Sequence, residues 1–169
     1  MRERRQASTE RRRAREFEAF VAGAAGRLLH AATLLTGEPA DAKPRADQLL
    51  TAALARTYAD WDRLRDGDPY DRARQELVTR YARGAWRHPR TGEGLLGRLG
   101  PQERLILVLR LYEGVAEEQT AALLGLPVER VRAICARAVS AMRQPPPPRR
   151  PAPHWPLSLL PPHSRQAAP

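Results

Sequence analysis

Cysteine is almost missing from this sequence, since Cys135 is the only one among 169 residues. A single thiol cannot form an intrachain disulfide or the thiolate cluster of a structural zinc site. The four histidines lie at positions 30, 88, 154 and 163 and show no metal-ligand spacing. No phosphate-cradling glycine loop or nucleophile motif is present, and the carboxylates are scattered over helix faces expected to be solvated. The sequence therefore predicts a protein that is not an enzyme and that needs no cofactor or metal.

Long apolar runs are also missing. No stretch approaches the roughly 18 apolar residues that span a bilayer. The N-terminal segment is basic and lacks the apolar core and small-residue cleavage site of a secretory signal. We therefore expect a soluble, cytoplasmic protein with no membrane partner.

Positive charge is abundant, with a net charge of +10, but it is concentrated at the two ends. Residues 1–15 carry seven arginines against two glutamates, and residues 143–169 carry four arginines and no acid. Basic ends can hold DNA without sequence preference through counterion release, or they can be solvated, disordered segments. We interpret residues 1–14 as a basic disordered arm, with both roles open.

Proline marks the C-terminal end, where ten of the 26 residues from Gln144 onward are proline. Proline has no backbone donor and favours an extended conformation, so such a segment does not build a core. Residues 144–169 are therefore predicted to be a Pro-rich disordered tail.

Between these ends, apolar residues recur at helical spacing, and strand-type alternation is absent. The pattern predicts helices over about 15–35 and 46–65 and a third helix through 73–86, separated by glycine–proline breaks. We expect an N-terminal three-helix bundle over residues 15–87, a short linker over 88–94 and a second helical domain over 95–143. The predicted fold class is all-α.

The most informative pattern lies in residues 117–143. A short helix over 117–124 is followed by Gly125, which adopts positive φ without steric cost, and by Leu126, which fills the corner. Pro127 then begins a helix whose outward side offers Glu129, Arg130, Arg132, Ala133, Ala136 and Arg137. A DNA-reading helix-turn-helix needs this pattern, because small residues fit the second helix into a major groove and arginine suits phosphate and guanine contacts. The alternative is an ordinary αα-corner with a solvated arginine face.

Two parts of the chain resemble one family. Residues 99–114 read LGPQERLILVLRLYEG and residues 118–125 read EQTAALLG, which resembles the C-terminal DNA-binding domain of extracytoplasmic-function sigma factors. Residues 17–21, 32–37, 53–58 and 86–87 resemble the N-terminal domain of that family in order and spacing. The resemblance covers about residues 15–143 and is closest to a sigma-E-like branch of actinobacteria.

This resemblance implies a transcription initiation protein that binds RNA polymerase core and directs it to promoter DNA, with 15–87 as region 2 and 95–143 as region 4. The residues implied to contact the upstream promoter element are Arg130, Arg132 and Arg137, with Ala133 and Glu129. The residues implied to lie near the melted downstream element are Tyr81, Arg83 and Trp86, although core packing is the alternative for the two aromatic residues. The residues implied to meet core polymerase are Asp47, Gln48, Thr51 and Ala52. A monomer is expected, and an anti-sigma factor is a further partner that the resemblance allows.

Two features keep other functions open. The family presents an acidic residue and a glutamine for core docking, where this chain has Gln48 and Thr51, with Asp47 adjacent. Residues 87–94 extend to roughly 25–30 Å, whereas promoter elements about 17 base pairs apart are separated by about 58 Å. One alternative is a helix-turn-helix regulator that does not bind core polymerase. Another is a degenerate sigma-like interaction protein.

Overall fold

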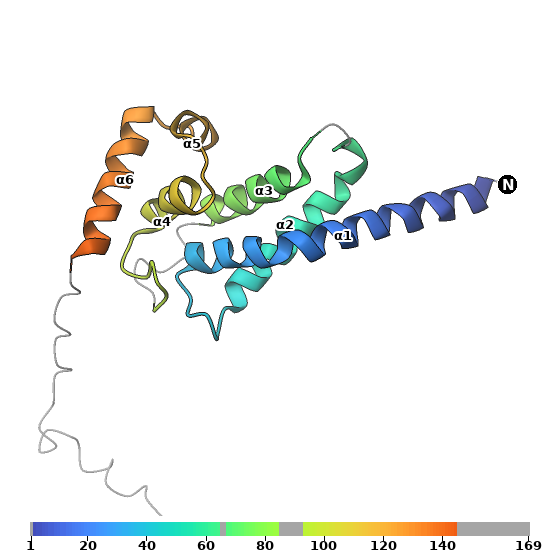
Figure 1. Cartoon of the computed structure of the whole chain (residues 1–169), viewed down its shortest axis with the longest axis horizontal. Coiled ribbons are helices and arrows are strands. Elements are labelled where there is room, and N and C mark those ends of the chain that lie inside the picture. Colours follow the sequence, from blue (N-terminus) through green and yellow to red (C-terminus); the bar gives the residue numbers. More distant parts are fainter. Residues whose placement is uncertain (1, 65–66, 85–92, 145–169) are drawn as a thin grey trace, which may run out of the picture.

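The computed structural model describes residues 2–64, 67–84 and 93–144 (Figure 1). Its elements, in chain order, are α1 (Arg2–Thr36), α2 (Pro44–Ala59), the 3-10 helix η1 (Trp61–Arg63), α3 (Pro69–Arg83), α4 (Pro101–Leu107), the π-helical turn η3 (Val108–Tyr112), α5 (Glu117–Leu124) and α6 (Val128–Arg143). Within these residues no strand occurs, which confirms the all-α prediction.

The bundle predicted for the N-terminal half is formed by α1, α2 and α3 (Figure 1). Its core positions include Leu28 and Leu35 on α1, Ala53 on α2 and Leu77 on α3, each with at most 1% of its surface exposed. These residues are buried because helical spacing places them on the inner face of each helix. The Glu38 carboxylate, in the turn after α1, accepts the backbone N–H groups of residues 45 and 46 at 3.1 and 2.9 Å and so caps α2.

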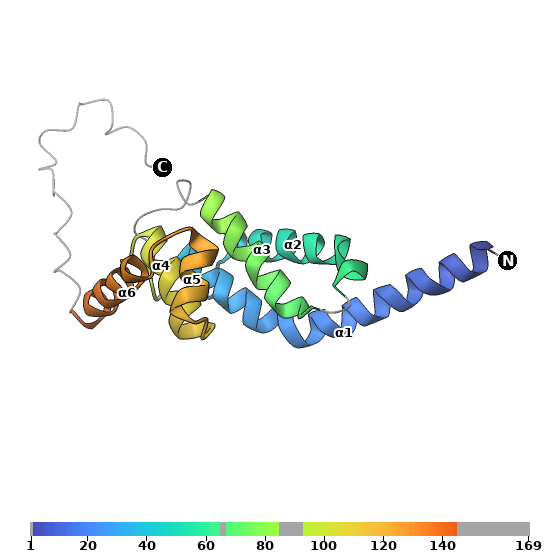
Figure 2. The same ribbon diagram turned by 90° about the horizontal axis from the view of Figure 1, so that it is seen from above.

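The N-terminal segment of the chain is helical, which differs from the prediction. Residues 1–14 were predicted to be disordered, but α1 is continuous from Arg2. The physical reason is composition: no glycine or proline precedes Gly23, and Arg, Ala, Glu and Gln favour helices. Residues 4–12 are exposed, and this part of α1 projects from the rest of the molecule (Figures 1 and 2).

The same helix, between Arg4 and Thr36, is long and apolar enough to pass a length-and-composition test for a membrane span. Core helices of soluble proteins pass this test too. Leu28, Ala32 and Leu35 are fully buried in the protein, which agrees with a core helix.

Other expectations fall on residues outside the described ones. These are most of the linker predicted over 88–94, the Pro-rich tail after Gln144, and Trp86.

The two halves of the chain share one core, which the sequence did not predict. A single hydrophobic cluster combines buried residues of α1, α2 and α3 with residues of the C-terminal half, including Leu99, Leu105, Val108 and Leu109. The backbone N–H of Gly94 donates to the Gly37 carbonyl at 2.9 Å, so the start of the C-terminal half lies beside the end of α1.

Arg104 lies at the centre of this contact with no exposed surface. Its Nη1 donates to the carbonyls of Leu35 and Thr36 in the N-terminal half, at 3.4 and 3.2 Å. Its Nε and Nη2 donate to the carbonyls of Leu96 and Gly97 in the C-terminal half, both at 3.1 Å. One guanidinium therefore ties the two halves together.

Glu113 provides a second tie. Both of its carboxylate oxygens accept the hydroxyl of Tyr70 on α3 at 3.0 Å. The same carboxylate pairs with Arg27 of α1 at 3.5 Å and with Arg74 of α3 at 3.8 Å, and only 1% of its side chain is exposed. We call the contacts of Arg104 and Glu113 across the two halves the interdomain joint.

Candidate nucleic-acid interface

The helix-turn-helix is built by α5 and α6. Gly125 ends α5 with φ of +64°, in the left-handed region that favours glycine, so the predicted turn is confirmed. Val131, Ile134 and Ala138 of α6 are buried, and a small cluster of α6, α5 and α4 residues packs around Ile106. This packing fixes which side of α6 faces solvent.

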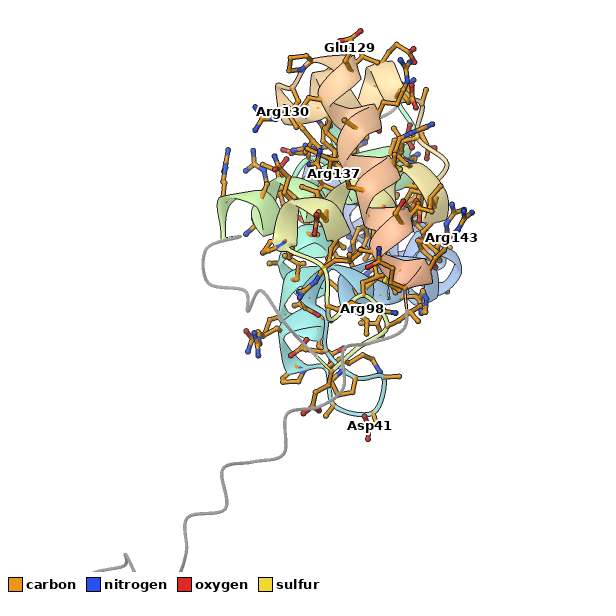
Figure 3. All side chains as sticks on the ribbon, turned by 90° about the vertical axis from the view of Figure 1, so that its left-hand side faces the viewer. Asp41, Arg98, Glu129, Arg130, Arg137 and Arg143 are labelled. Atoms are coloured by element: carbon orange, nitrogen blue, oxygen red, sulfur yellow. The ribbon has the colours of Figure 1, made fainter. Side chains whose placement is uncertain are left out.

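The five residues predicted to contact the upstream element all lie exposed on α6; they are Glu129, Arg130, Arg132, Ala133 and Arg137. Arg130, Ala133 and Arg137 are spaced by three and four residues, so they share one face of the helix. Figure 3 shows Arg130 and Arg137 extending from α6 into solvent. The structure therefore assembles two arginines and a small residue on one exposed helix face, as major-groove reading requires.

Arg132 has a different environment from the other two arginines. Its Nη2 and Nε contact Glu117 of α5 at 2.8 and 3.1 Å. The hydrogen bonds that Arg132 donates to the Glu117 carboxylate raise the pKa of Arg132 above its ordinary value. Arg110 also reaches Glu117, at 3.6 Å, so this carboxylate links the first helix of the motif to its neighbours. Arg132 thus connects α6 to α5.

Arg98 is a cation near this face that sequence reasoning missed. It precedes α4 and donates to the carbonyls of Met142 and Gln144 at 3.1 and 2.6 Å, close to Arg143 at the end of α6 (Figure 3). These hydrogen bonds satisfy carbonyls at a helix C-terminus, where a cation is favourable. No sequence signal identified Arg98, because it lies 46 residues from Gln144 along the chain.

Of the residues predicted for the downstream element, Tyr81 and Arg83 lie in the described part of the chain and differ in exposure. Tyr81 has no exposed surface, and its hydroxyl donates to the Pro101 carbonyl of the C-terminal half at 3.3 Å. Burial raises the pKa of Tyr81 to about 12. Arg83 is exposed at the end of α3, and Trp86 lies outside the described residues. In this arrangement Tyr81 is a core residue, the alternative noted from the sequence.

The residues predicted for core docking share one side of α2. Asp47, Gln48 and Thr51 are exposed and Ala52 is half-buried. The Thr51 hydroxyl donates to the Asp47 carbonyl one turn earlier, at 2.8 Å. This side of α2 offers a short polar surface of low charge.

In the part of the chain that the structure describes, no group of three or more His, Cys, Asp or Glu side chains could hold a metal ion.

Comparison with known proteins places this geometry in context. Residues 95–144, which contain α4 to α6, match the family model described as sigma-70, region 4. Over 154 residues the chain is 28% identical to the RNA polymerase sigma-E factor of Streptomyces coelicolor, which covers 76% of this chain and 85% of the relative. It is similarly 28% identical to the RNA polymerase sigma-E factor of Streptomyces avermitilis, covering 76% and 84%. The protein of the same description from Streptomyces antibioticus is 27% identical, covering 76% and 83%.

Proposed function

Because this chain belongs to the extracytoplasmic-function RNA polymerase sigma factors, in the sigma-E-like branch, we propose that it binds core RNA polymerase and directs it to promoter DNA. The observation that carries this proposal is the helix-turn-helix of α5 and α6, which exposes Arg130 and Arg137 within the region 4 match. We propose that the protein acts in the cytoplasm, where it binds core polymerase and positions it on DNA. We propose no catalytic reaction for it.

The C-terminal half is proposed to read the upstream promoter element. Arg130 and Arg137 would enter the major groove, with Ala133 allowing close approach and Glu129 at the start of the helix. Arg132 would act through Glu117 by holding the angle of the reading helix.

The N-terminal half is proposed to bind core polymerase through Asp47, Gln48, Thr51 and Ala52 on α2, and the downstream element through the end of α3. Tyr81 is covered by the C-terminal half in the free protein, and only Arg83 of the described downstream residues is exposed. We therefore propose that the halves separate on the polymerase, which uncovers Tyr81 and lets the chain span both elements.

The free protein is proposed to be a monomer. An anti-sigma factor is a further candidate partner.

The test is co-elution with core polymerase from a GC-rich bacterium in size-exclusion chromatography, with a known sigma factor as competitor. We expect the protein to co-elute and the competitor to displace it. A Gln48→Arg, Thr51→Arg variant should lose co-elution, because two added cations change the polar side of α2. Ala22→Arg, on an exposed position of α1, is the control and should still co-elute.

Failure of the native protein to co-elute, while a known sigma factor binds, would contradict the proposal. The free-standing helix-turn-helix regulator would then be the better description.

A further inference from the structure

The first turns of α1 form a basic rod outside the body of the protein. We define the N-terminal arm as residues 2–15 of α1 and its arginine face as Arg4, Arg5, Arg11, Arg12 and Arg15. All five are exposed. The arm starts at the end of the molecule opposite α6 (Figures 1 and 2).

The arginines gather on one side of the helix. With about 3.6 residues per turn, positions seven and eleven apart fall nearly in line. Arg4, Arg11 and Arg15 therefore form one row, and Arg5 and Arg12 form the adjacent row. Glu10 falls on the side opposite Arg5 and Arg12. The arm thus has a continuous cationic side, and this follows from the positions of the arginines and not only from their number.

This cationic side is hardly neutralised by the protein itself. Among the residues that the structure describes, its ion pair is Arg12 with Glu16, at 3.7 Å between two side chains that are 65% and 55% exposed. An exposed pair of this kind contributes little. Arg15 donates to the carbonyl of Arg11 at 3.3 Å, which leaves its charge in place.

Arg13 belongs to the same arm but faces the body. Its guanidinium lies 4.4 Å from the ring centroid of Tyr58 and 3.2 Å from the Asp62 carboxylate. Phe17 packs against Tyr58 and Trp61 one turn later, with ring centroids 4.8 and 5.1 Å apart. These contacts anchor the base of the arm and fix the direction in which the arginine face points.

We propose that the arginine face binds the phosphate backbone of duplex DNA without base specificity, as a contact additional to the helix-turn-helix. The inference rests on the proposed function only in taking promoter DNA as the partner. Like charges one turn apart destabilise an isolated helix, and a short exposed helix is marginal in water, so a polyanion along this face stabilises the arm.

Dimensions and chemistry favour duplex DNA as the partner. Residues 4–15 span about 16 Å at a rise of 1.5 Å per residue, an axial length over which each strand of duplex DNA carries about five phosphates, one per 3.4 Å of axis. The guanidinium fork suits phosphate oxygens. The arginine face contains no aromatic residue, and stacking on aromatic rings is the usual means of holding unpaired bases. A backbone contact on duplex DNA is therefore preferred to a single-strand contact.

The experiment measures the salt dependence of DNA binding by the full-length protein, using fluorescence anisotropy with a labelled 40-base-pair duplex of scrambled sequence. The test variant is Arg4→Gln, Arg11→Gln, Arg15→Gln, which removes one row and keeps good helix formers. The control variant is Arg45→Gln, Arg56→Gln, Arg63→Gln, which removes the same charge from exposed positions on α2 and η1. Circular dichroism verifies that both remain helical.

We expect the slope of log Kobs against log salt to fall by about 2.7 in the test variant, because each lost phosphate contact lowers it by about 0.9. The control should change the slope by less than about 0.5 on the same scale. An unchanged slope in the test variant, or equal losses in both variants, would overturn the inference. A loss seen with a single-stranded 40-mer and not with the duplex would overturn it as well.

Co-elution with core polymerase separates this inference from the proposed function. The test variant should bind core as the native protein does. Loss of core binding with an unchanged DNA slope would mean that the arm contacts an acidic surface of the polymerase and would overturn the DNA assignment. If the native protein fails to bind core while the slope still depends on the arm, the sigma function fails and the arm contact stands.

Discussion

At the scale of single residues, Arg104 shows what the sequence could not reveal. An arginine is seldom fully buried, and this one is tolerated because carbonyls from both halves accept its N–H groups. In the sequence Arg104 is one of many arginines on amphipathic helices. Its burial depends on Leu35 and Thr36, which lie almost seventy residues earlier, so no local pattern marks it.

Replacing this guanidinium should destabilise the protein strongly. For Arg104→Met we expect the free energy of unfolding to fall by about 3 kcal/mol or more, since several buried carbonyls lose a charged donor. Urea denaturation followed by circular dichroism measures the change. Arg63→Ala is the control, because the Arg63 side chain is 86% exposed, and it should change stability by less than about 0.5 kcal/mol. Equal effects of the two substitutions would contradict the role of Arg104.

Tyr81 should make stability depend on pH in the alkaline range. Its pKa is raised to about 12 in the folded protein by burial, whereas an unfolded tyrosine titrates near 10. The unfolded chain therefore releases a proton first as the pH rises above 10, and the stability contributed by Tyr81 is lost between about pH 10 and 12. We expect Tyr81→Phe to lose less stability from pH 9 to 11.5 than the native protein in urea titrations. Identical pH profiles would be inconsistent with this account.

At the scale of elements, local signals were sufficient for the helices and for the helix-turn-helix. Gly125 and the apolar spacing of α6 are encoded within a few residues, so the motif was predictable. The finer assignment of α6 was less so. Ile134 is buried with Ile106 of α4, whereas its neighbour Ala133 is exposed. Adjacent positions differ by only 100° around a helix, so the partner helix decides which of them is covered.

The arginines of α6 should differ in what their removal does. Arg130→Ala is expected to weaken binding to a specific promoter duplex by about 1–3 kcal/mol, as loss of a base or phosphate contact does. Arg132→Ala removes an exposed ion pair with Glu117, so its effect on protein stability should be small. Anisotropy on the holoenzyme with specific and scrambled duplexes gives the first quantity, and urea denaturation gives the second. A loss of specific binding in Arg132→Ala that exceeds that in Arg130→Ala would reverse these roles.

At the scale of the whole molecule, the sequence indicated two domains but not their contact. Glu113 follows η3, Tyr70 and Arg74 lie on α3 and Arg27 lies on α1, so their meeting is a property of tertiary packing. Helical periodicity identifies which face of each helix is apolar, but it does not identify which other element covers that face.

Binding to core polymerase should move the halves apart. Donor and acceptor dyes are placed at Ala59→Cys on α2 and Ser140→Cys on α6, both exposed positions, in a Cys135→Ser background. We expect high energy transfer in the free protein and a clear decrease when core polymerase is added, because the two promoter elements are about 58 Å apart. Constant transfer in a transcriptionally competent complex would mean that the closed arrangement persists on the enzyme.

The interdomain joint also limits how this protein can be recombined with its relatives. The Glu113 carboxylate is buried only because Tyr70, Arg27 and Arg74 come from the other half. A region 4 from another protein, grafted after residue 94, would place its own residue at this position. That residue would lie against one hydroxyl and two guanidinium groups that pair with a glutamate in this protein. We therefore expect that replacing the C-terminal half of this protein alone does not transfer a new promoter preference. A functional chimera must carry a matched pair of surfaces, one from each half.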